Sequence, residues 1–351
     1  MKPDRAGSPF HVVGENIHAT RVVKRSGRHA VEADDGTVGI AFESPGGTRQ
    51  VLPVHPDLVT GRDFTTGRIK HVASALLWGL GGDTAADTAA AYVRSMASRQ
   101  EAAGADWLDL NVDEIAPKSA MRTRAMTWLV AAVEASATVP VSIDSSDVAV
   151  LAAGVAASTK PAGRLMLNSA SLERPEVLEL AATSGCAVVL AASGRSGMPS
   201  DAAERVANAT ELIQEARARG IPGSLLYVDP LVLPVAVAPE APGHVLEAAR
   251  RLRDAFGTDI HLTGGLSNVS FGLPERRLIN DVFIDLAAGA GIDGGIIDPV
   301  SSDLTRVFAA DRDTEPYRLA ADLLLGRDAF GGAYVAAFRE GRLAGADSAA
   351  G

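Results

Sequence analysis

The sequence lacks three features that mark large classes of proteins. Cys186 is the one cysteine in 351 residues, which excludes disulfide bonds within the chain and zinc sites built from several cysteines. No apolar run reaches the roughly 20 residues of a membrane span, and no signal peptide is expected. Basic residues are in the minority, with 33 Lys and Arg against 43 Asp and Glu. We therefore expect a cytoplasmic protein with no nucleic-acid or membrane partner.

The composition indicates a folded chain with a large core. Hydrophobic residues make up 47% of the sequence and charged residues 22%, which is typical of globular proteins. The length suits either two average domains or one large α/β barrel that has grown by insertion.

Short β-rich runs alternate with Ala-rich helical runs from about residue 83 onward. The helical runs, such as 174–185 and 274–291, carry apolar residues at i, i+3 and i+4 and close on Gly. Such alternation predicts parallel strands covered by helices. Eight strands are expected, the number that closes a (β/α)8 TIM barrel, although an open doubly wound sheet is an alternative: 11–14, 105–112, 139–144, 163–168, 186–192, 224–229, 259–265 and 293–299.

Two segments depart from this alternation. Residues 22–70 are polar, and β-like runs flank the turn sequence Pro-Gly-Gly at 45–47, so we expect a β-hairpin inserted after strand 1. It would serve either as a structural flap or dimer arm or as a substrate lid. Residues 302–351 are expected to add C-terminal helices and a frayed Gly/Ala-rich tail. We interpret residues 1–351 as a single barrel domain with these two additions.

Nearly every predicted strand ends in a carboxylate or a carboxamide. Barrel enzymes place catalytic groups at these ends, yet no Ser-His-Asp set, activated cysteine or Schiff-base lysine stands there. The candidates, with His18 as a further residue near the first strand end, are Glu15, Asn16, Asp109, Asn111, Asp144, Asn168, Asp229, Asn268 and Asp298.

A ring of Asp and Asn suits a ligand rich in N–H and C=O groups, such as a pterin or purine, because carboxylates accept hydrogen bonds and carboxamides both donate and accept. Metal binding is a rival use. The many carboxamides disfavour magnesium, no helical His-x-x-x-His spacing supports zinc, and we predict no metal ion. Capping of the following helix explains any single Asp as well, but not the whole set.

Six motifs at these strand ends resemble, in the same order, those of one enzyme family: GADWLDLNV at 104–112, VSIDSSD at 141–147, LMLNSAS at 165–171, VDPLVLPV at 228–235, GLSNVSFGLPERRLIN at 265–280 and GIDGGIIDP at 291–299. Together with Gly-Glu-Asn at 14–16, the sequence resembles the methyltetrahydrofolate:corrinoid methyltransferases. These are pterin-binding barrels related to dihydropteroate synthase and to the folate module of cobalamin-dependent methionine synthase. The family usually has Arg and Asn where this sequence has Asn16 and His18.

The resemblance implies an enzyme that moves a methyl group between methyltetrahydrofolate and the cobalt of a corrinoid, in either direction. The corrinoid would be carried by a partner protein, since no cobalamin domain is left once the barrel is placed, and the enzyme would be a homodimer. Asn268 would be catalytic, beside the methyl-bearing ring nitrogen, as a donor whose hydrogen bond strengthens in the transition state. The resemblance implies pterin binding by Asp144, Asn168 and Asp229. We add Asn111 and Asp298 as pterin-binding candidates, and as candidates for other substrate or corrinoid contacts Glu15, Asn16, His18 and Asp109.

Two other functions compete with this interpretation. A dihydropteroate synthase-like pterin enzyme is ranked lower, because that family carries a basic motif near strand seven or eight and Gly-Gly-Leu-Ser-Asn at 264–268 offers no cation. A non-catalytic corrinoid-binding protein is suggested by Asp259, His261 and Gly264, which spell D-x-H-x-x-G. That run alternates like a strand, so we interpret His261 as an ordinary strand histidine.

Overall fold

The computed structural model describes residues 2–4, 6–34, 36–82 and 85–343, so the predicted tail at 344–351 lies outside the described residues. Its strands are β1 (Lys2–Pro3), β2 (Pro9–His18), β3 (Val22–Lys24), β4 (Ala30–Glu32), β5 (Val38–Glu43), β6 (Arg49–Pro53), β7 (Arg68–Lys70), β8 (Trp107–Asn111), β9 (Val141–Asp144), β10 (Leu165–Ala170), β11 (Ala187–Ala191), β12 (Leu226–Asp229), β13 (His261–Leu262) and β14 (Gly294–Ile297).

The α-helices are α1 (Pro56–Val59), α2 (Arg62–Thr65), α3 (His71–Gly81), α4 (Ala86–Ala102), α5 (Ser119–Glu134), α6 (Val148–Ala157), α7 (Glu176–Ser184), α8 (Ala202–Ala218), α9 (Ala241–Phe256), α10 (Arg276–Gly289), α11 (Leu304–Ala309), α12 (Glu315–Leu324) and α13 (Gly332–Arg339). Short 3-10 helices are η1 (Asp113–Ile115), η2 (Ala162–Arg164), η3 (Gly223–Leu225), η4 (Leu266–Ser270) and η5 (Ala329–Gly331).

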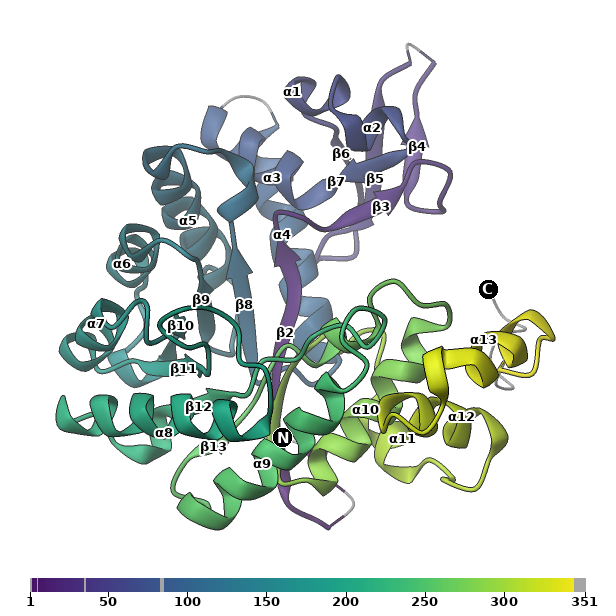
Figure 1. Ribbon diagram of the computed structural model, residues 1–351. Coiled ribbons are helices and arrows are strands. Elements are labelled where there is room, and N and C mark those ends of the chain that lie inside the picture. The colour runs from purple at the N-terminus through teal and green to yellow at the C-terminus, as the bar shows by residue number, and fades with distance from the viewer. Residues whose placement is uncertain (1, 5, 35, 83–84, 344–351) are drawn as a thin grey trace. The chain divides into compact units, whose positions relative to one another are not determined.

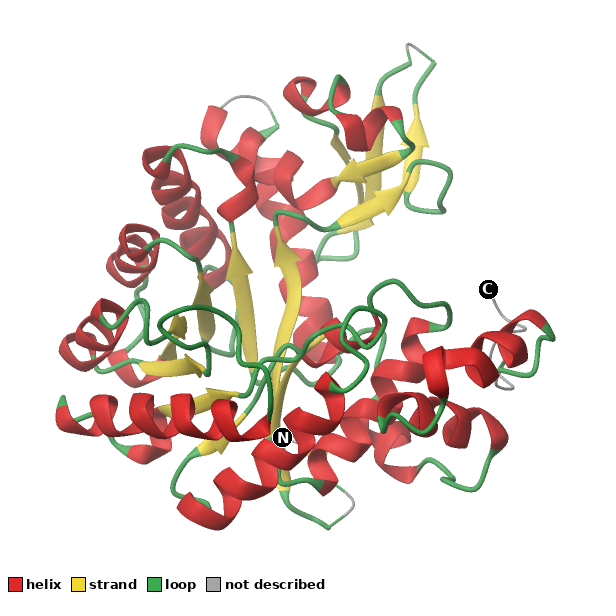
Figure 2. Cartoon of the chain, viewed as in Figure 1, coloured by secondary structure: helices red, strands yellow, loops and turns green. Residues whose placement is uncertain are grey.

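The largest sheet has the strand order of an α/β barrel. Its order is β1-β2-β8-β9-β10-β11-β12-β13, and β14 pairs with β2. The pairs β8–β9, β9–β10, β11–β12 and β12–β13 are parallel, and the short β1 pairs with β2 in antiparallel orientation. Helices alternate with these strands along the chain (Figure 2). The protein therefore has the (β/α)8 TIM-barrel fold, and all eight predicted strands are present.

The chain divides into two compact units, which are described separately here. The first unit comprises Met1–Val13, Ala170–Ala182 and Ala187–Gly351, and the second comprises Gly14–Ser169 and Thr183–Cys186.

In the second unit, strand alternation separates an apolar face from a polar one. Leu108 and Leu110 on β8 and Val141 and Ile143 on β9 are completely buried, while α5 contacts β8 and α6 contacts β9. Because successive side chains of a strand point to opposite faces, the residues between these apolar positions share the other face. Burying such aliphatic side chains stabilises the fold by about 1.5–3 kcal/mol each.

The insertion after β2 contains the predicted hairpin and more. The antiparallel pair β5–β6 sets Phe42 opposite Gln50 and Glu43 opposite Arg49 around the Pro-Gly-Gly turn, which confirms the hairpin. Beyond the prediction, β4 adds to β5, β3 pairs with β7, and α1 and α2 lie beside these strands (Figure 1). The insertion is thus a small subdomain, in which Ile40 and Leu52 are buried on strands that α4 also contacts.

In the first unit, the C-terminal helices pack on the barrel helix α10. Helices α11 and α12 both contact α10, and α12 buries Tyr317, Leu323 and Leu324. The Tyr317 hydroxyl donates to Asp285 Oδ2 at 2.6 Å, and Asp285 also pairs with Arg312 at 2.9 Å. The predicted C-terminal helices are therefore present, and their apolar face is largely covered by their own chain. Within the described residues, no helix combines the length and apolarity that crossing a bilayer requires.

Candidate functional site

Three neighbouring strands of the second unit end in polar side chains that stand in register. Asn111 on β8 is paired with Asp144 on β9, and Asp144 with Asn168 on β10. Asp109 precedes Asn111 by two residues and shares its face of the strand. The local pattern of one buried apolar residue followed by one polar residue thus brings four predicted site residues together.

These four residues, which we call the strand-end cluster (Asp109, Asn111, Asp144 and Asn168), are linked by hydrogen bonds. Asn111 Nδ2 donates to Asp144 Oδ2 at 2.8 Å, and Asn168 Nδ2 donates to Asp109 Oδ1 at 3.4 Å. Only 4% of Asp109 and 6% of Asn111 is exposed. A buried set of this kind needs its donors and acceptors matched, by the protein or by a ligand.

Burial changes the protonation of the two carboxyl groups. It raises the pKa of Asp109 to about 6, against hydrogen bonds that include the one from Asn168. Burial, and then the nearby charge of Asp109, raises the pKa of Asp144 well above its usual range. The two carboxyls also hydrogen-bond to each other. Burial thus favours the protonated form of both carboxyls, and the charge of Asp109 favours it further in Asp144, so the pair is suited to sharing one proton beside the N–H donors of Asn111 and Asn168.

The loops that follow β8 and β9 are tied together by Asp113. Its Oδ1 accepts from the Ser145 hydroxyl at 2.5 Å, and its Oδ2 accepts from the Ser146 backbone and hydroxyl at 2.8 and 2.7 Å. Asp147, the last residue of the VSIDSSD motif, caps α6 by accepting from Ala149 N at 2.9 Å. This residue has the capping role, whereas Asp144 in the same motif does not.

The end of β2 supplies Glu15, Asn16 and His18. Glu15 forms an ion pair with Arg21 at 2.6 Å, and the Asn16 backbone N–H donates to Gln100 Oε1 at 3.0 Å. His18 Nδ1 accepts from Thr20, which leaves its proton on Nε2. Burial, then the charge of Arg21, lowers the pKa of His18, so the ring is neutral at pH 7.

In the first unit, Asp229 ends β12 in a fixed position. Its Oδ1 accepts from Leu231 N at 2.7 Å, and the backbone N–H of Gly265 donates to the same carboxylate. Burial raises the pKa of Asp229 to about 6, while these two N–H groups and the charge of Arg205 oppose the rise. Asp229 is thus an acceptor that is near its titration point at mildly acidic pH.

Asn268 lies on η4, the 3-10 helix that begins directly after Gly265. A Cβ added to Gly265 would lie 2.6 Å from Asn268 Nδ2, so the absence of a side chain there is what admits the carboxamide. In the part of the chain that the structure describes, the Asn268 carboxamide makes no hydrogen bond. Its N–H groups are therefore available to a ligand.

Asp298 follows β14 and is engaged in its own turn. Its carboxylate accepts from Val300 N at 3.0 Å and from Ser301 N and Oγ at 3.2 and 2.8 Å. Such an Asx turn is a local structural role.

At the opposite, amino-terminal ends of the strands, His261 and Asp293 form a separate polar network. His261 Nδ1 lies 2.8 Å from Asp293 Oδ2, and its ring stacks on Tyr227 at 4.6 Å. Asp293 also accepts from Arg253 at 2.9 Å and from Leu262 N at 2.7 Å. His11 completes a set that is close enough to bind a metal ion. However, the charge of Asp293 is already balanced by Arg253, which favours a structural role.

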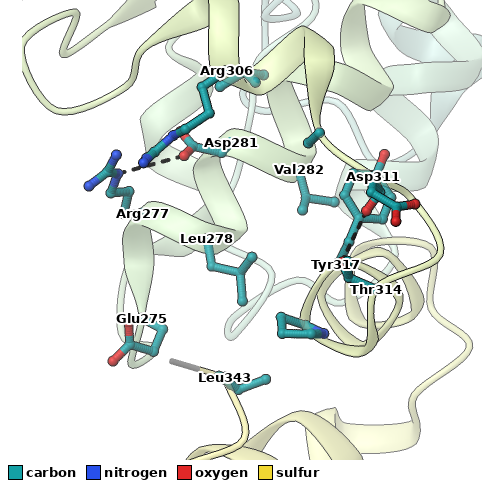
Figure 3. Close-up of a pocket in the computed structure, with 13 residues that line it drawn as sticks. Glu275, Arg277, Leu278, Asp281, Val282, Arg306, Asp311, Thr314, Tyr317 and Leu343 are labelled. Carbon is teal, nitrogen blue, oxygen red and sulfur yellow. Dashed lines mark hydrogen bonds and ion pairs between the residues drawn. The ribbon is translucent and has the colours of Figure 1, made fainter. Parts of the chain in front are cut away.

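A pocket of about 590 Å³ lies in the first unit between α10, α11 and α12. Leu278 and Val282 form its floor, and Arg277 faces Asp281 at 3.8 Å on its rim (Figure 3). None of the predicted site residues lines it. We do not assign the pocket to the reaction.

One residue next to the candidate site, Arg205, was not predicted from the sequence. Arg205 is almost completely buried on α8 and acts on the Asp229 loop. The signal was available, because Arg205 occupies the apolar face of its helix together with Ala202, Ala209 and Leu212. A charged residue at a core-facing position calls for a specific partner.

Comparison with known proteins identifies the class to which this fold and these strand ends belong. Residues 82–298, more than half of the chain, match the family described as pterin binding enzyme. The chain belongs to this family.

Among curated proteins, the chain is 28% identical over 258 residues to the methylcorrinoid:tetrahydrofolate methyltransferase of Eubacterium limosum, covering 72% of this chain and 89% of that protein. It is 30% identical over 248 residues to methionine synthase of Mycobacterium tuberculosis, covering 66% of this chain and 20% of that protein. Dihydropteroate synthase from Xanthomonas albilineans, solved in complex with 7,8-dihydropteroate, aligns with a TM-score of 0.50 at 22% identity over 65% of this chain and 86% of that one. The last likeness concerns the fold alone.

Proposed function

We propose that the protein is a methyltransferase that moves a methyl group between methyltetrahydrofolate and the cobalt of a corrinoid carried by a partner protein. The observation that carries the proposal is the buried strand-end cluster, with its mixture of protonated carboxyl, carboxylate and carboxamide groups. Membership of the pterin-binding family and the likeness to a methylcorrinoid:tetrahydrofolate methyltransferase support it. The folate is a substrate, and the corrinoid arrives on the partner.

The strand-end cluster suits one edge of a pterin ring. That edge presents ring N–H and amino donors next to a carbonyl acceptor. Asp109 accepts from N–H groups, and Asp144, whose pKa is raised further by the charge of Asp109, donates together with the carboxamides of Asn111 and Asn168. Each hydrogen bond to a charged group is worth about 1.5–3 kcal/mol in a buried site. We assign these four residues to pterin binding.

Asp229 and Asn268 have complementary roles on either side of Gly265. Asp229 accepts a hydrogen bond from the pterin, and Asn268 donates to the ring nitrogen that bears the methyl group. Cob(I)alamin supplies a strong nucleophile, so the protein has to orient the folate and stabilise the nitrogen that departs. A fixed amide donor that is not engaged elsewhere is suited to that task.

The remaining candidates lie further from the ring chemistry in this proposal. Glu15, Asn16 and the neutral His18 contact the rest of the folate or the corrinoid partner, and Asp298 contributes through the loop that it shapes. The protein acts in the cytoplasm, where a Co(I) species can be maintained, and it acts as a homodimer.

The decisive experiment is methyl transfer with purified protein. Methyltetrahydrofolate and free cob(I)alamin are mixed with the enzyme, and loss of the cob(I)alamin absorbance is followed. We expect turnover with the wild-type protein and with Asp259→Asn, a control at a carboxylate that is 66% exposed. The double variant Asp109→Asn/Asp144→Asn should be inactive. A folded wild-type enzyme that neither transfers the methyl group nor binds methyltetrahydrofolate would refute the proposal.

A further inference from the structure

Arg205 is a buried cation that forms no direct ion pair with any residue that the structure describes. It is 1% exposed and is one of the largest fully buried side chains. Its guanidinium donates to four backbone carbonyls: Nε to Pro230 at 2.9 Å, Nη1 to Pro199 at 3.2 Å and Asp201 at 3.0 Å, and Nη2 to Leu231 at 3.5 Å. Burying a charge without a partner is costly, so this arrangement calls for a compensating role.

Two of these carbonyls belong to the turn that follows Asp229. Leu231 has φ = 67°, in the left-handed region that a residue other than glycine rarely adopts, at a cost on the order of 1–3 kcal/mol. In this conformation its N–H donates to Asp229 Oδ1 at 2.7 Å. By holding the carbonyls of Pro230 and Leu231, Arg205 fixes the turn that presents this N–H to the carboxylate.

Three carboxylates act on the charge of Arg205: Asp201, Asp229 and Glu204. Asp201 and Glu204 lie at the exposed start of α8 and are engaged locally, because Asp201 Oδ1 accepts from Glu204 N and Glu204 accepts from Ser200. Asp229 is the buried one. Conversely, Arg205 is the one charged side chain among the groups that act on Asp229, the others being the N–H groups of Leu231 and Gly265.

Arg253 in the same unit shows what a purely structural arginine looks like here. It donates to the carbonyls of Ile260 and Gly291 at 3.0 and 2.8 Å, as Arg205 does to its own loops. However, Arg253 also pairs directly with Asp293 at 2.9 Å. The charge of Arg253 is therefore neutralised by its ion pair with Asp293, whereas the charge of Arg205 acts on Asp229.

We propose that Arg205 is a positioning residue for folate binding, which holds the Pro230–Leu231 turn in place and stabilises Asp229 as a carboxylate that accepts a hydrogen bond from the pterin. This inference rests on the proposed function and adds a residue on α8 to the site. The effect on Asp229 concerns the ligand-free protein as well, so it can be tested without folate.

The positive charge of Arg205 determines the direction in which the pKa of Asp229 should change when Arg205 is replaced. Burial already raises the pKa of Asp229 to about 6. Removing a nearby cation disfavours the ionised carboxylate further, so the pKa rises again, by about one unit for a charge that is not in direct contact. Folate affinity that depends on the carboxylate would then be lost at a higher pH than in the wild type.

The test compares Arg205→Gln, which keeps donors but no charge, with Arg205→Lys, which keeps the charge but not the planar fork. Arg253→Met is the matched control. The titration of Asp229 is followed by ¹³C NMR of labelled aspartate carboxyls in the ligand-free protein, and its signal is assigned by its loss in Asp229→Asn. Methyltetrahydrofolate affinity is measured by calorimetry between about pH 5 and 8.5, the range that brackets the expected titration.

We expect Arg205→Gln to move both midpoints upward by about one pH unit, which corresponds to roughly twofold weaker binding at pH 7, about tenfold weaker binding near pH 5, and recovery at higher pH. Arg205→Lys should keep the wild-type midpoints, and Arg253→Met should shift neither. An Asp229 titration that is unchanged in folded Arg205→Gln would overturn the proposal, as would an equal loss of affinity at every pH in both Arg205 variants. If wild-type protein binds no folate, the proposed function fails, while the NMR titration still decides the role of Arg205.

Discussion

Asn111 and Asp144 lie directly opposite each other in the parallel pair β8–β9, and Asn111 Nδ2 donates to Asp144 Oδ2 at 2.8 Å. Asp144 also hydrogen-bonds with Asp109, and its pKa is raised by burial and by that neighbour's charge. Burial and mutual repulsion therefore favour a state in which the two carboxyls share one proton. A neutral ligand edge with N–H and C=O groups is a better partner for such a set than a metal ion, which prefers several ionised oxygens.

This shared proton predicts non-additive effects of substitution. Asp109→Asn and Asp144→Asn each leave one carboxyl, which ionises once its neighbour is neutral, so each should weaken folate binding only a few-fold. The double variant leaves no carboxylate and should lose about 1.5–3 kcal/mol more than the sum of the single changes. Calorimetric titration of all four proteins at pH 7.5 measures the coupling. Strictly additive losses would mean that the two carboxyls act independently.

The Asp229 carboxylate is predicted to lower the stability of the fold at neutral pH, although it contributes to folate binding. Its folded-state pKa of about 6 exceeds the usual aspartate pKa of 3.8, so the folded protein binds more protons than the unfolded chain between these values. The contribution of this group to stability therefore falls as pH rises through that window. We expect Asp229→Asn to raise the free energy of unfolding at pH 7.5 by about 1–3 kcal/mol, an advantage that disappears near pH 4.

Asp147 provides a control of opposite sign for that experiment. Its pKa is lowered, first by the hydrogen bond from Ser119 and also by Arg122, so its carboxylate stabilises the fold at neutral pH. Asp147→Asn should therefore lower the stability at pH 7.5, and the loss should shrink as pH falls below about 4. Urea unfolding at both pH values compares the two variants. Destabilisation by Asp229→Asn at pH 7.5 would contradict the assignment of Asp229 as a strained functional carboxylate.

The sequence predicts the site residues whose positions follow from local strand alternation, but not the features that depend on contacts between distant segments. Strand alternation placed Asn111, Asp144 and Asp229 at the final positions of β8, β9 and β12, as the structure has them. These positions follow from local periodicity, which the sequence carries. By contrast, β2 extends well beyond the predicted 11–14, and it does so as a neighbour of β8 and β14, which are distant in the sequence.

The unpredicted features arise from contacts between distant segments. The shared proton of Asp109 and Asp144 requires the register of two strands about 33 residues apart and their common burial, neither of which a single strand reveals. Arg205 likewise acquires its role from a turn 25 residues further on. Capping by Asp147 and turn formation by Asp298 look the same in the sequence as binding by Asp144, and only the hydrogen bonds separate them.

The proposed homodimer is expected to use the aromatic residues that the C-terminal helices leave uncovered. Phe330 on η5 is 101% exposed and Phe338 on α13 is 40% exposed, although the rest of this extension packs on its own chain. We expect a dimer by light scattering at micromolar concentration, and a shift toward monomer in Phe330→Ser/Phe338→Ser. Val237→Ser, at a residue that is 81% exposed elsewhere in the first unit, is the control. A monomeric wild-type protein would remove this prediction.

The catalytic role of Asn268 makes the sharpest kinetic prediction. In methyltetrahydrofolate the methylated ring nitrogen is a weak acceptor, and it takes the electron pair of the carbon–nitrogen bond, and with it negative charge, as that bond breaks. A hydrogen bond from the Asn268 amide therefore strengthens toward the transition state and lowers the barrier more than it lowers the dissociation constant. Losing one preorganised donor of this kind costs about 10²–10³-fold in rate. We expect that loss in the single-turnover rate of Asn268→Ala, with folate affinity changed only a few-fold.

Gly265→Ala separates the position of this amide from its presence. Gly265 has φ = −70°, which alanine adopts without strain, but the added Cβ would lie 2.6 Å from Asn268 Nδ2 and would displace the carboxamide. We therefore expect Gly265→Ala to slow methyl transfer toward the level of Asn268→Ala. Because the same donor is affected, the double variant should be little slower than Asn268→Ala alone. Rate and affinity that fall by equal factors in Asn268→Ala would instead assign the side chain to holding the loop after β13.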